Sequence, residues 1–286
     1  MSKKPIAVLG VIGIAAVAGV IALVNSMGSS INSFTLPKIG PACVVRADGE
    51  VSLDTVQMAN AATIAAVGIN RKMPERAIVV ALATALQESK LENIEYGDRD
   101  SLGLFQQRPS KGWGKPAQLL DPRYSSRKFY SSLKKVKGWE KMRVTDAAQR
   151  VQRSAYPEAY QKWAEEAEVL AKALTGRATS AVACTLTGEP TMRGAAAAQK
   201  LTAGLKLDWG KAKVKPISPT AGLTLTVSNL DAGWRYAHWL VAHARDTGLE
   251  RVRFADLEWS APTGEWQPVT GDRKVGNARV VAEVFS

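Results

Sequence analysis

The sequence predicts a mainly α domain that follows an N-terminal transmembrane helix and precedes a small α/β (α+β) C-terminal domain. Three observations support this order. Residues 6–24 are apolar and carry no charge. Between residues 54 and 174, apolar side chains recur at intervals of three and four, which is the spacing of helices that bury one face. After residue 185 the chain becomes rich in Gly, Thr and Pro, and short alternating stretches typical of strands follow.

The N-terminal stretch has the length of a membrane span. Its 19 residues would form a helix of about 28 Å, close to the ~30 Å hydrocarbon core of a bilayer. Lys3 and Lys4 precede the stretch, and no clear small-x-small cleavage site follows it. We therefore expect residues 1–25 to be a cytoplasmic tail and single-pass anchor in the cell membrane, with the bulk of the chain outside. Cleavage near residues 24–26, which would give a secreted protein, is the alternative.

Composition suggests where the domains begin and end. Residues 26–42, rich in Ser, Gly and Pro, are predicted to be a linker. A domain at 43–184, a second linker at 185–194 and a small α/β domain of unknown role at 195–286 follow, and the last could bind a protein partner. The chain has two cysteines, Cys43 and Cys184, which bracket the first domain. On the oxidising side of a membrane we expect them to form a disulfide.

The net charge of +12 implies attraction to polyanions such as nucleic acid, anionic lipid or an anionic bacterial wall. No zinc-finger spacing, RNA-binding aromatic signature or recognition helix is present, so we expect no nucleic-acid partner. The two histidines, His238 and His243, are five residues apart and do not form the i, i+4 pair of a helical zinc site. No metal site and no cofactor are therefore predicted.

Helix and strand signals give the order of the elements. Helices are expected at 54–67, with Gly68 as the C-cap, then at 75–89, around 124–135, after a cap at 145–146, and at 158–174. Pro157 should break or restart the helix that precedes it. In the C-terminal part we expect strands at 223–227, 251–254 and 280–285 and a helix at 232–247.

The helix at 75–89 is the centre of the functional prediction. Residues 77–86 are apolar except for Thr84, which is too continuous for a surface helix, so we expect it to be buried. Glu88 lies near its C-terminal end, where loss of water should favour the protonated carboxyl. A carboxyl in such a setting can act as a general acid. The polar, Gly-containing segment 96–109 should be a loop or short hairpin that folds back over this helix end.

Two short motifs in this region resemble those of a known family. Glu88-Ser89, followed fifteen residues later by Gly103-Leu104-Phe105-Gln106, is similar to the glutamate-serine and Gly-Leu-Met-Gln motifs of soluble lytic transglycosylases of the lysozyme superfamily. The resemblance covers roughly residues 60–174 and implies a lysozyme-like domain. It also implies that the partner is the glycan strand of peptidoglycan.

The resemblance assigns roles to individual residues. It implies that Glu88 is the catalytic acid/base and that Ser89, Gly103 and Gln106 orient it and hold the substrate. The third motif of the family places a tyrosine after alanine or asparagine on a later helix. Ala155-Tyr156 fits, but Pro157 departs from the usual continuation, so the choice between Tyr156 and Tyr160 stays open.

The family chemistry needs one carboxyl group. Glu88 would protonate the oxygen between N-acetylmuramic acid and N-acetylglucosamine, then accept the proton of the muramic C6 hydroxyl as a 1,6-anhydro ring closes. A hydrolytic muramidase is the first alternative, with Asp98 or Asp100 positioning a water. These two aspartates could instead pair with Arg99 and stiffen the loop. A non-catalytic wall-binding or secretion/conjugation assembly factor is the alternative from another class.

Overall fold

The computed structural model describes residues 42–286, of which 46% are helical and 20% lie in strands. The strands form two antiparallel sheets of three and six strands. The predicted fold class, a mainly α lysozyme-like domain followed by a small α/β domain, is therefore wrong. The predicted membrane span at 6–24 lies outside the described residues. Between residues 42 and 286 no helix is both long enough and apolar enough to cross a bilayer.

The three-stranded sheet joins the start of the described chain to its middle. It contains β1 (Ala42–Arg46), β2 (Glu50–Asp54) and β3 (Val182–Thr185) in the order β2-β1-β3. Cys43 and Cys184 face each other across β1 and β3 and form a disulfide, which confirms that prediction. These strands have only four or five residues each, and their periodicity is too brief to predict them. Pairing between segments 141 residues apart is what forms the sheet.

Helix α2 (Thr55–Asn70) follows β2 directly. The Asp54 carboxylate accepts hydrogen bonds from the backbone N–H groups of Val56 and Gln57 and forms a capping box with Gln57. The predicted C-cap role of Gly68 is wrong, because the helix continues past it. A Cβ at Gly68 would lie 2.7 Å from the Tyr130 hydroxyl, so the glycine allows another helix to pack closely.

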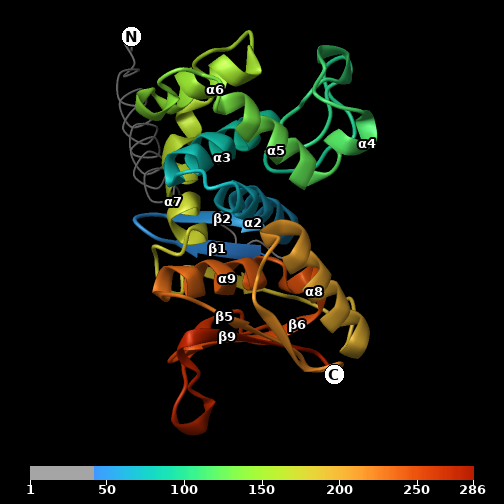
Figure 1. Ribbon diagram of the computed structural model, residues 1–286, viewed down its shortest axis with the longest axis vertical. Helices are drawn as coiled ribbons and strands as arrows, with labels where there is room; N and C mark the ends of the chain where they lie inside the picture. The colour runs from blue at the N-terminus through green and yellow to red at the C-terminus, as the bar shows by residue number, and fades with distance from the viewer. Residues whose placement is uncertain (1–41) are drawn as a thin grey trace, which may run out of the picture. The chain divides into compact units, whose positions relative to one another are not determined.

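Helix α3 (Glu75–Ser89) has the predicted bounds and is surrounded by other helices. Its residues 77–86 are all buried. Helix α2 and three further helices contact it, as Figure 1 shows for this part of the chain: α5 (Pro122–Leu133), α6 (Val144–Gln152) and α7 (Ala164–Leu174). Because all sides of α3 are apolar, burial on all sides stabilises it.

The remaining elements of this region are short. They are η1 (Pro109–Lys111), α4 (Pro116–Leu119), η2 (Trp139–Lys141) and η3 (Gln161–Trp163). Helix α6 ends at Gln152, with Arg153 in the left-handed conformation, five residues before Pro157. The segment predicted as one helix at 158–174 is divided into η3 and α7. The chain between α6 and α7 therefore turns back toward α3.

The six-stranded sheet lies in the C-terminal part of the chain. Its order is β4-β5-β9-β6-β7-β8, with every pair antiparallel. The strands are β4 (Val214–Ser218), β5 (Gly222–Thr226), β6 (Leu249–Ala255), β7 (Leu257–Ser260), β8 (Trp266–Pro268) and β9 (Gly276–Val284). The other elements are α8 (Gly194–Trp209), α9 (Leu230–Ala242), α10 (Ala244–Thr247) and η4 (Gly271–Arg273). Residues 42–286 belong to one compact unit, and the linker predicted at 185–194 lies inside it.

Helix α9 packs on the large sheet and also on the N-terminal part of the described chain. It contacts β6 and β9 on one side and α2, α7 and β3 on the other. A Cβ at Gly233 would lie 1.9 Å from the Phe254 ring, so only glycine allows the helix to lie this close to β6. His238 is fully buried: its Nδ1 donates to the Ala173 carbonyl at 2.8 Å, and its Nε2 accepts from the Ala181 N–H at 2.9 Å.

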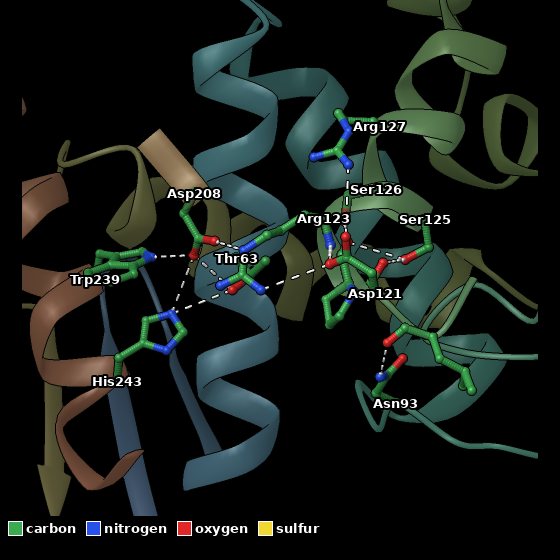
Figure 2. Close-up of polar contacts among 12 residues, drawn as sticks. Thr63, Asn93, Asp121, Arg123, Ser125, Ser126, Arg127, Asp208, Trp239 and His243 are labelled. Atoms are coloured by element: carbon green, nitrogen blue, oxygen red, sulfur yellow. Dashed lines mark hydrogen bonds and ion pairs between the residues drawn. The ribbon is translucent and has the colours of Figure 1, made fainter. Parts of the chain in front are cut away.

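A buried carboxylate adds a polar link between the two parts (Figure 2). Asp208 of α8 is fully buried, and its Oδ2 accepts hydrogen bonds from Thr63 Oγ1 at 3.0 Å and Trp239 Nε1 at 2.8 Å. Its Oδ1 lies 2.5 Å from Nε of Arg123, at the start of α5. His243 Nε2 is 3.7 Å from Oδ2. The carboxylate therefore joins α2, α5, α8 and α9.

Asp208→Asn should destabilise the fold, because it leaves the Arg123 guanidinium without its buried partner. Loss of one member of a buried ion pair costs about 3 kcal/mol or more. Urea denaturation measures this change. Asp256→Asn, which breaks an exposed pair with Lys274 at 3.0 Å, is the matched control and should change stability by less than about 1 kcal/mol. Equal effects of the two substitutions would contradict the assigned role of Asp208.

The buried His238 should make stability fall in acid. Burial lowers the pKa of His238 from 6.5 to about 4. The unfolded chain therefore takes up a proton near pH 6.5, and the folded chain takes it up only near pH 4. The contribution is complete above pH 6.5 and is lost as the pH falls toward 4, by about 3 kcal/mol.

His238→Gln tests this, because glutamine keeps one donor and one acceptor but does not titrate. The free energy of unfolding, measured from pH 7.5 to 4.5, should fall more steeply in the wild type than in the variant. Parallel curves would show that His238 does not titrate differently in the folded and unfolded states.

Candidate active site

The end of α3 holds one carboxylate between two hydrogen-bond donors. Glu88 Oε1 accepts from the Tyr160 hydroxyl at 2.7 Å and from Gln152 Nε2 at 3.1 Å. The Gln152 amide also donates to the Phe105 carbonyl at 2.8 Å, so it links the carboxylate to the loop at residues 96–109, called the motif loop below. From residues 42–286, no donor reaches Oε2. A proton on Glu88 would therefore be carried by Oε2.

Two opposing effects set the pKa of Glu88. Burial raises it above its ordinary value, and the hydrogen bonds from Tyr160 and Gln152 lower it, with burial the larger effect. The pKa of Tyr160 is raised by burial and by the neighbouring Glu88 charge, so its hydroxyl stays protonated and donates. Glu88 can thus carry a proton in one step and be stabilised as a carboxylate in the next.

Ser89 fastens the motif loop to the helix. Its buried hydroxyl lies 2.9 Å from the Leu104 carbonyl and 3.1 Å from the Ala85 carbonyl. It therefore contacts the loop backbone, and the structure gives it no hydrogen bond to Glu88. Gln107 is also buried and donates from Nε2 to the Ser125 carbonyl at 3.2 Å. Together these contacts fix the loop between α3 and α5.

Gly103 and Gln106 shape the turn of this loop. Gly103 has φ +73°, and a Cβ there would lie 2.4 Å from the Leu119 carbonyl oxygen, so no other residue fits. Gln106 also has a positive φ, +45°. Its Nε2 donates to the Gly103 carbonyl at 3.2 Å, and its side chain lines the cleft described below. The predicted folding of this segment over the helix end is confirmed.

The two candidate aspartates differ in their surroundings. Asp100 accepts from Arg108 Nε at 2.8 Å and from the Ser110 N–H at 2.7 Å, and these contacts hold its pKa well below the usual range. Asp100 thus stiffens the loop. Asp98 is 88% exposed, lies 3.9 Å from Arg99 Nε and lines the same cleft as Glu88. Asp98 is therefore the aspartate that is available to a substrate.

Tyr156 and Tyr160, which the sequence left as alternatives, have different positions. Tyr160 is 1% exposed and donates to Glu88, whereas Tyr156 is 74% exposed and lines the cleft. The turn between α6 and α7 brings Tyr160 back to α3. Tyr160 follows Ala159 and lies in a turn just before η3, so its contact with Glu88 comes from the fold of this segment.

Glu88 opens into a large cleft. The cleft has a volume of about 1250 Å³ and is bounded by the motif loop, α5, the segment after α5, and the end of α6. Trp113 and Tyr156 contribute aromatic surface to it.

The sequence did not indicate Gln152. Glutamine on an amphipathic helix is ordinarily solvent-exposed, and no spacing relates this residue to Glu88, which is 64 positions earlier. A signal for Tyr160 was present in Ala159-Tyr160, but only the turn after α6 selects it over Tyr156. The structure gives the described residues no group of three or more His, Cys, Asp or Glu side chains suited to a metal ion.

No protein-family model matches this chain, and no curated protein matches it. The functional argument therefore rests on the motifs and on the geometry around Glu88.

Tyr160→Phe should raise the pKa of Glu88 further, because it removes a hydrogen bond that stabilises the carboxylate. A hydrogen bond to a charged group contributes enough free energy for its loss to raise the pKa of Glu88 by about one unit. A ¹³C NMR titration of the Glu88 carboxyl group measures it. Tyr156→Phe is the control and should leave the pKa unchanged. A lower pKa in Tyr160→Phe would contradict the assigned hydrogen bond.

Proposed function

We propose that this chain is a peptidoglycan lytic transglycosylase that cleaves the β-1,4 bond between N-acetylmuramic acid and N-acetylglucosamine. One observation carries the proposal: the half-buried Glu88, held at Oε1 by Tyr160 and Gln152, opens into a large cleft. Burial favours its protonated form, which a general acid requires. The lytic transglycosylase motifs at 88–89 and 103–106 support the same assignment.

In the first step Glu88 acts as the acid. Its proton passes from Oε2 to the glycosidic oxygen, and the bond from that oxygen to the anomeric carbon breaks. Positive charge develops on the sugar while Glu88 becomes a carboxylate. The Tyr160 and Gln152 donors, already in place at Oε1, stabilise the new negative charge without rearrangement.

In the second step the same carboxylate acts as the base. It accepts the proton of the C6 hydroxyl of the muramic residue as that oxygen bonds to the anomeric carbon. The 1,6-anhydro ring closes, Glu88 regains its proton, and no water is consumed. One residue therefore serves both steps, which agrees with a pKa subject to opposing effects.

Two further features suit an extracytoplasmic glycan substrate. Trp113 and Tyr156 offer aromatic faces on which the apolar side of a sugar ring can pack. The Cys43–Cys184 disulfide is of a kind that persists outside the cytoplasm, where peptidoglycan lies.

A muramidase is the second candidate, and the position of Asp98 favours it. The exposed Asp98 carboxylate lines the same cleft as Glu88 and could position a water. The product distinguishes the two reactions, because hydrolysis leaves a reducing muramic acid and the transglycosylase leaves the 1,6-anhydro form.

Glu88→Gln should reduce turnover by about 10²- to 10⁴-fold, because it keeps the shape of the side chain but removes the transferable proton. Mass analysis of the muropeptides released from purified peptidoglycan measures both rate and product. Glu92→Gln, at an exposed neighbouring position, is the control and should retain wild-type turnover.

The products decide between the candidates. Anhydro products from the wild type, with little effect of Asp98→Asn, are expected for the transglycosylase. Reducing-end products would overturn that assignment and keep Glu88 as the acid. Unchanged turnover in Glu88→Gln would overturn both.

A further inference from the structure

The cleft around Glu88 carries a strong excess of positive charge. Eight Lys or Arg side chains and two carboxylates line it, an excess of six, which is half of the net charge of +12 of the whole chain. Two of the eight, Arg99 and Arg108, lie beside Asp98 and Asp100. The other six form what we call the basic wall: Lys111, Lys128, Lys135, Lys137, Arg150 and Arg153.

Among the described residues, the basic wall forms no close ion pairs, and the one acidic residue whose pKa one of its members lowers is Asp146, through Arg150. Within residues 42–286, none of its six cations lies within 4.0 Å of a carboxylate oxygen. The cations come from four places: η1, α5, the segment after α5, and the end of α6. A second groove, around Glu75 and Lys172, is lined by six carboxylates and three cations. Positive charge is therefore concentrated at the cleft and is not a general property of every groove.

The excess positive charge of the basic wall suits a negatively charged ligand. A neutral glycan chain would gain no electrostatic attraction from these cations. An anionic substrate would be attracted to them.

We propose that the basic wall binds the carboxylates of the peptide stems on the muramyl residues, so that the enzyme prefers peptide-bearing strands over naked glycan. The inference rests on the proposed function. The cations come from four separate places along the cleft, as suits several carboxylates on a flexible peptide. A phosphate polymer attached at the muramic C6 oxygen would block the hydroxyl that the reaction needs, so carboxylates are the better match.

The experiment compares kcat/KM on strands of equal length with and without peptide stems. Wild type should cleave peptide-bearing strands about 10-fold better, and the preference should shrink between 50 and 500 mM NaCl as screening increases. Strands whose stem carboxylates have been converted to amides should behave as naked strands. Equal cleavage of carboxylate and amide forms would overturn the proposal, since the peptide would then act without its charge.

A triple variant locates the effect in the basic wall. Lys135→Gln, Lys137→Gln and Arg153→Gln together should bring the ratio of kcat/KM on peptide-bearing strands to kcat/KM on naked strands close to one, because exposed ion pairs contribute modestly one by one and more in a group. The matched control changes Lys211, Lys213 and Lys215, which are exposed and do not line the cleft, to Gln. It should keep the preference.

The remaining outcomes separate this inference from the proposed function. Equal cleavage of peptide-bearing and naked strands to anhydro products would overturn the inference and keep the transglycosylase. Better cleavage of strands that carry phosphodiester polymer and no peptide would show a phosphate ligand and overturn the carboxylate assignment. Absence of anhydro products from every strand would overturn the proposed function itself.

Discussion

The complete burial of α3 is the constraint on which the rest of the structure depends. Ten consecutive residues, 77–86, are each at most 4% exposed to solvent. Other elements must therefore cover every side of the helix. Helices α2, α5, α6 and α7 do so. The helix emerges at its last turn, which places Glu88 where the core meets the cleft. The burial that stabilises the fold thus also raises the pKa of the candidate acid.

Buried polar contacts attach the C-terminal part to this helical region. Asp208 bonds or pairs with residues of α2, α5 and α9, and His238 bonds the Ala173 carbonyl in α7 and the N–H of Ala181, just before β3. Because Arg123 lies in the first turn of α5, and α5 lines the cleft, the Asp208 contact helps to fix one side of the candidate site (Figure 2). We infer a supporting role for residues 194–286 in holding the cleft.

Charge in the site serves two purposes that oppose each other. Tyr160 and Gln152 stabilise the ionised form of Glu88, while burial favours the protonated form. A residue that must donate and then accept a proton needs such a balance. A substrate that brings negative charge into the cleft would shift this balance toward the protonated acid when it binds.

The sequence by itself determined the buried helix at 75–89, the position of Glu88 at its end, the loop over it and the disulfide pair, because each depends on local patterning or on the number of cysteines. It did not reveal the three-stranded sheet, because its strands are short and β1 pairs with β3 across a separation of 141 residues. Nor did it reveal Gln152, or choose Tyr160 over Tyr156. Both Gln152 and Tyr160 reach Glu88 through contacts between segments that are distant in the sequence. The turn after α6 brings Tyr160 back to Glu88, and no local sequence pattern predicts that turn.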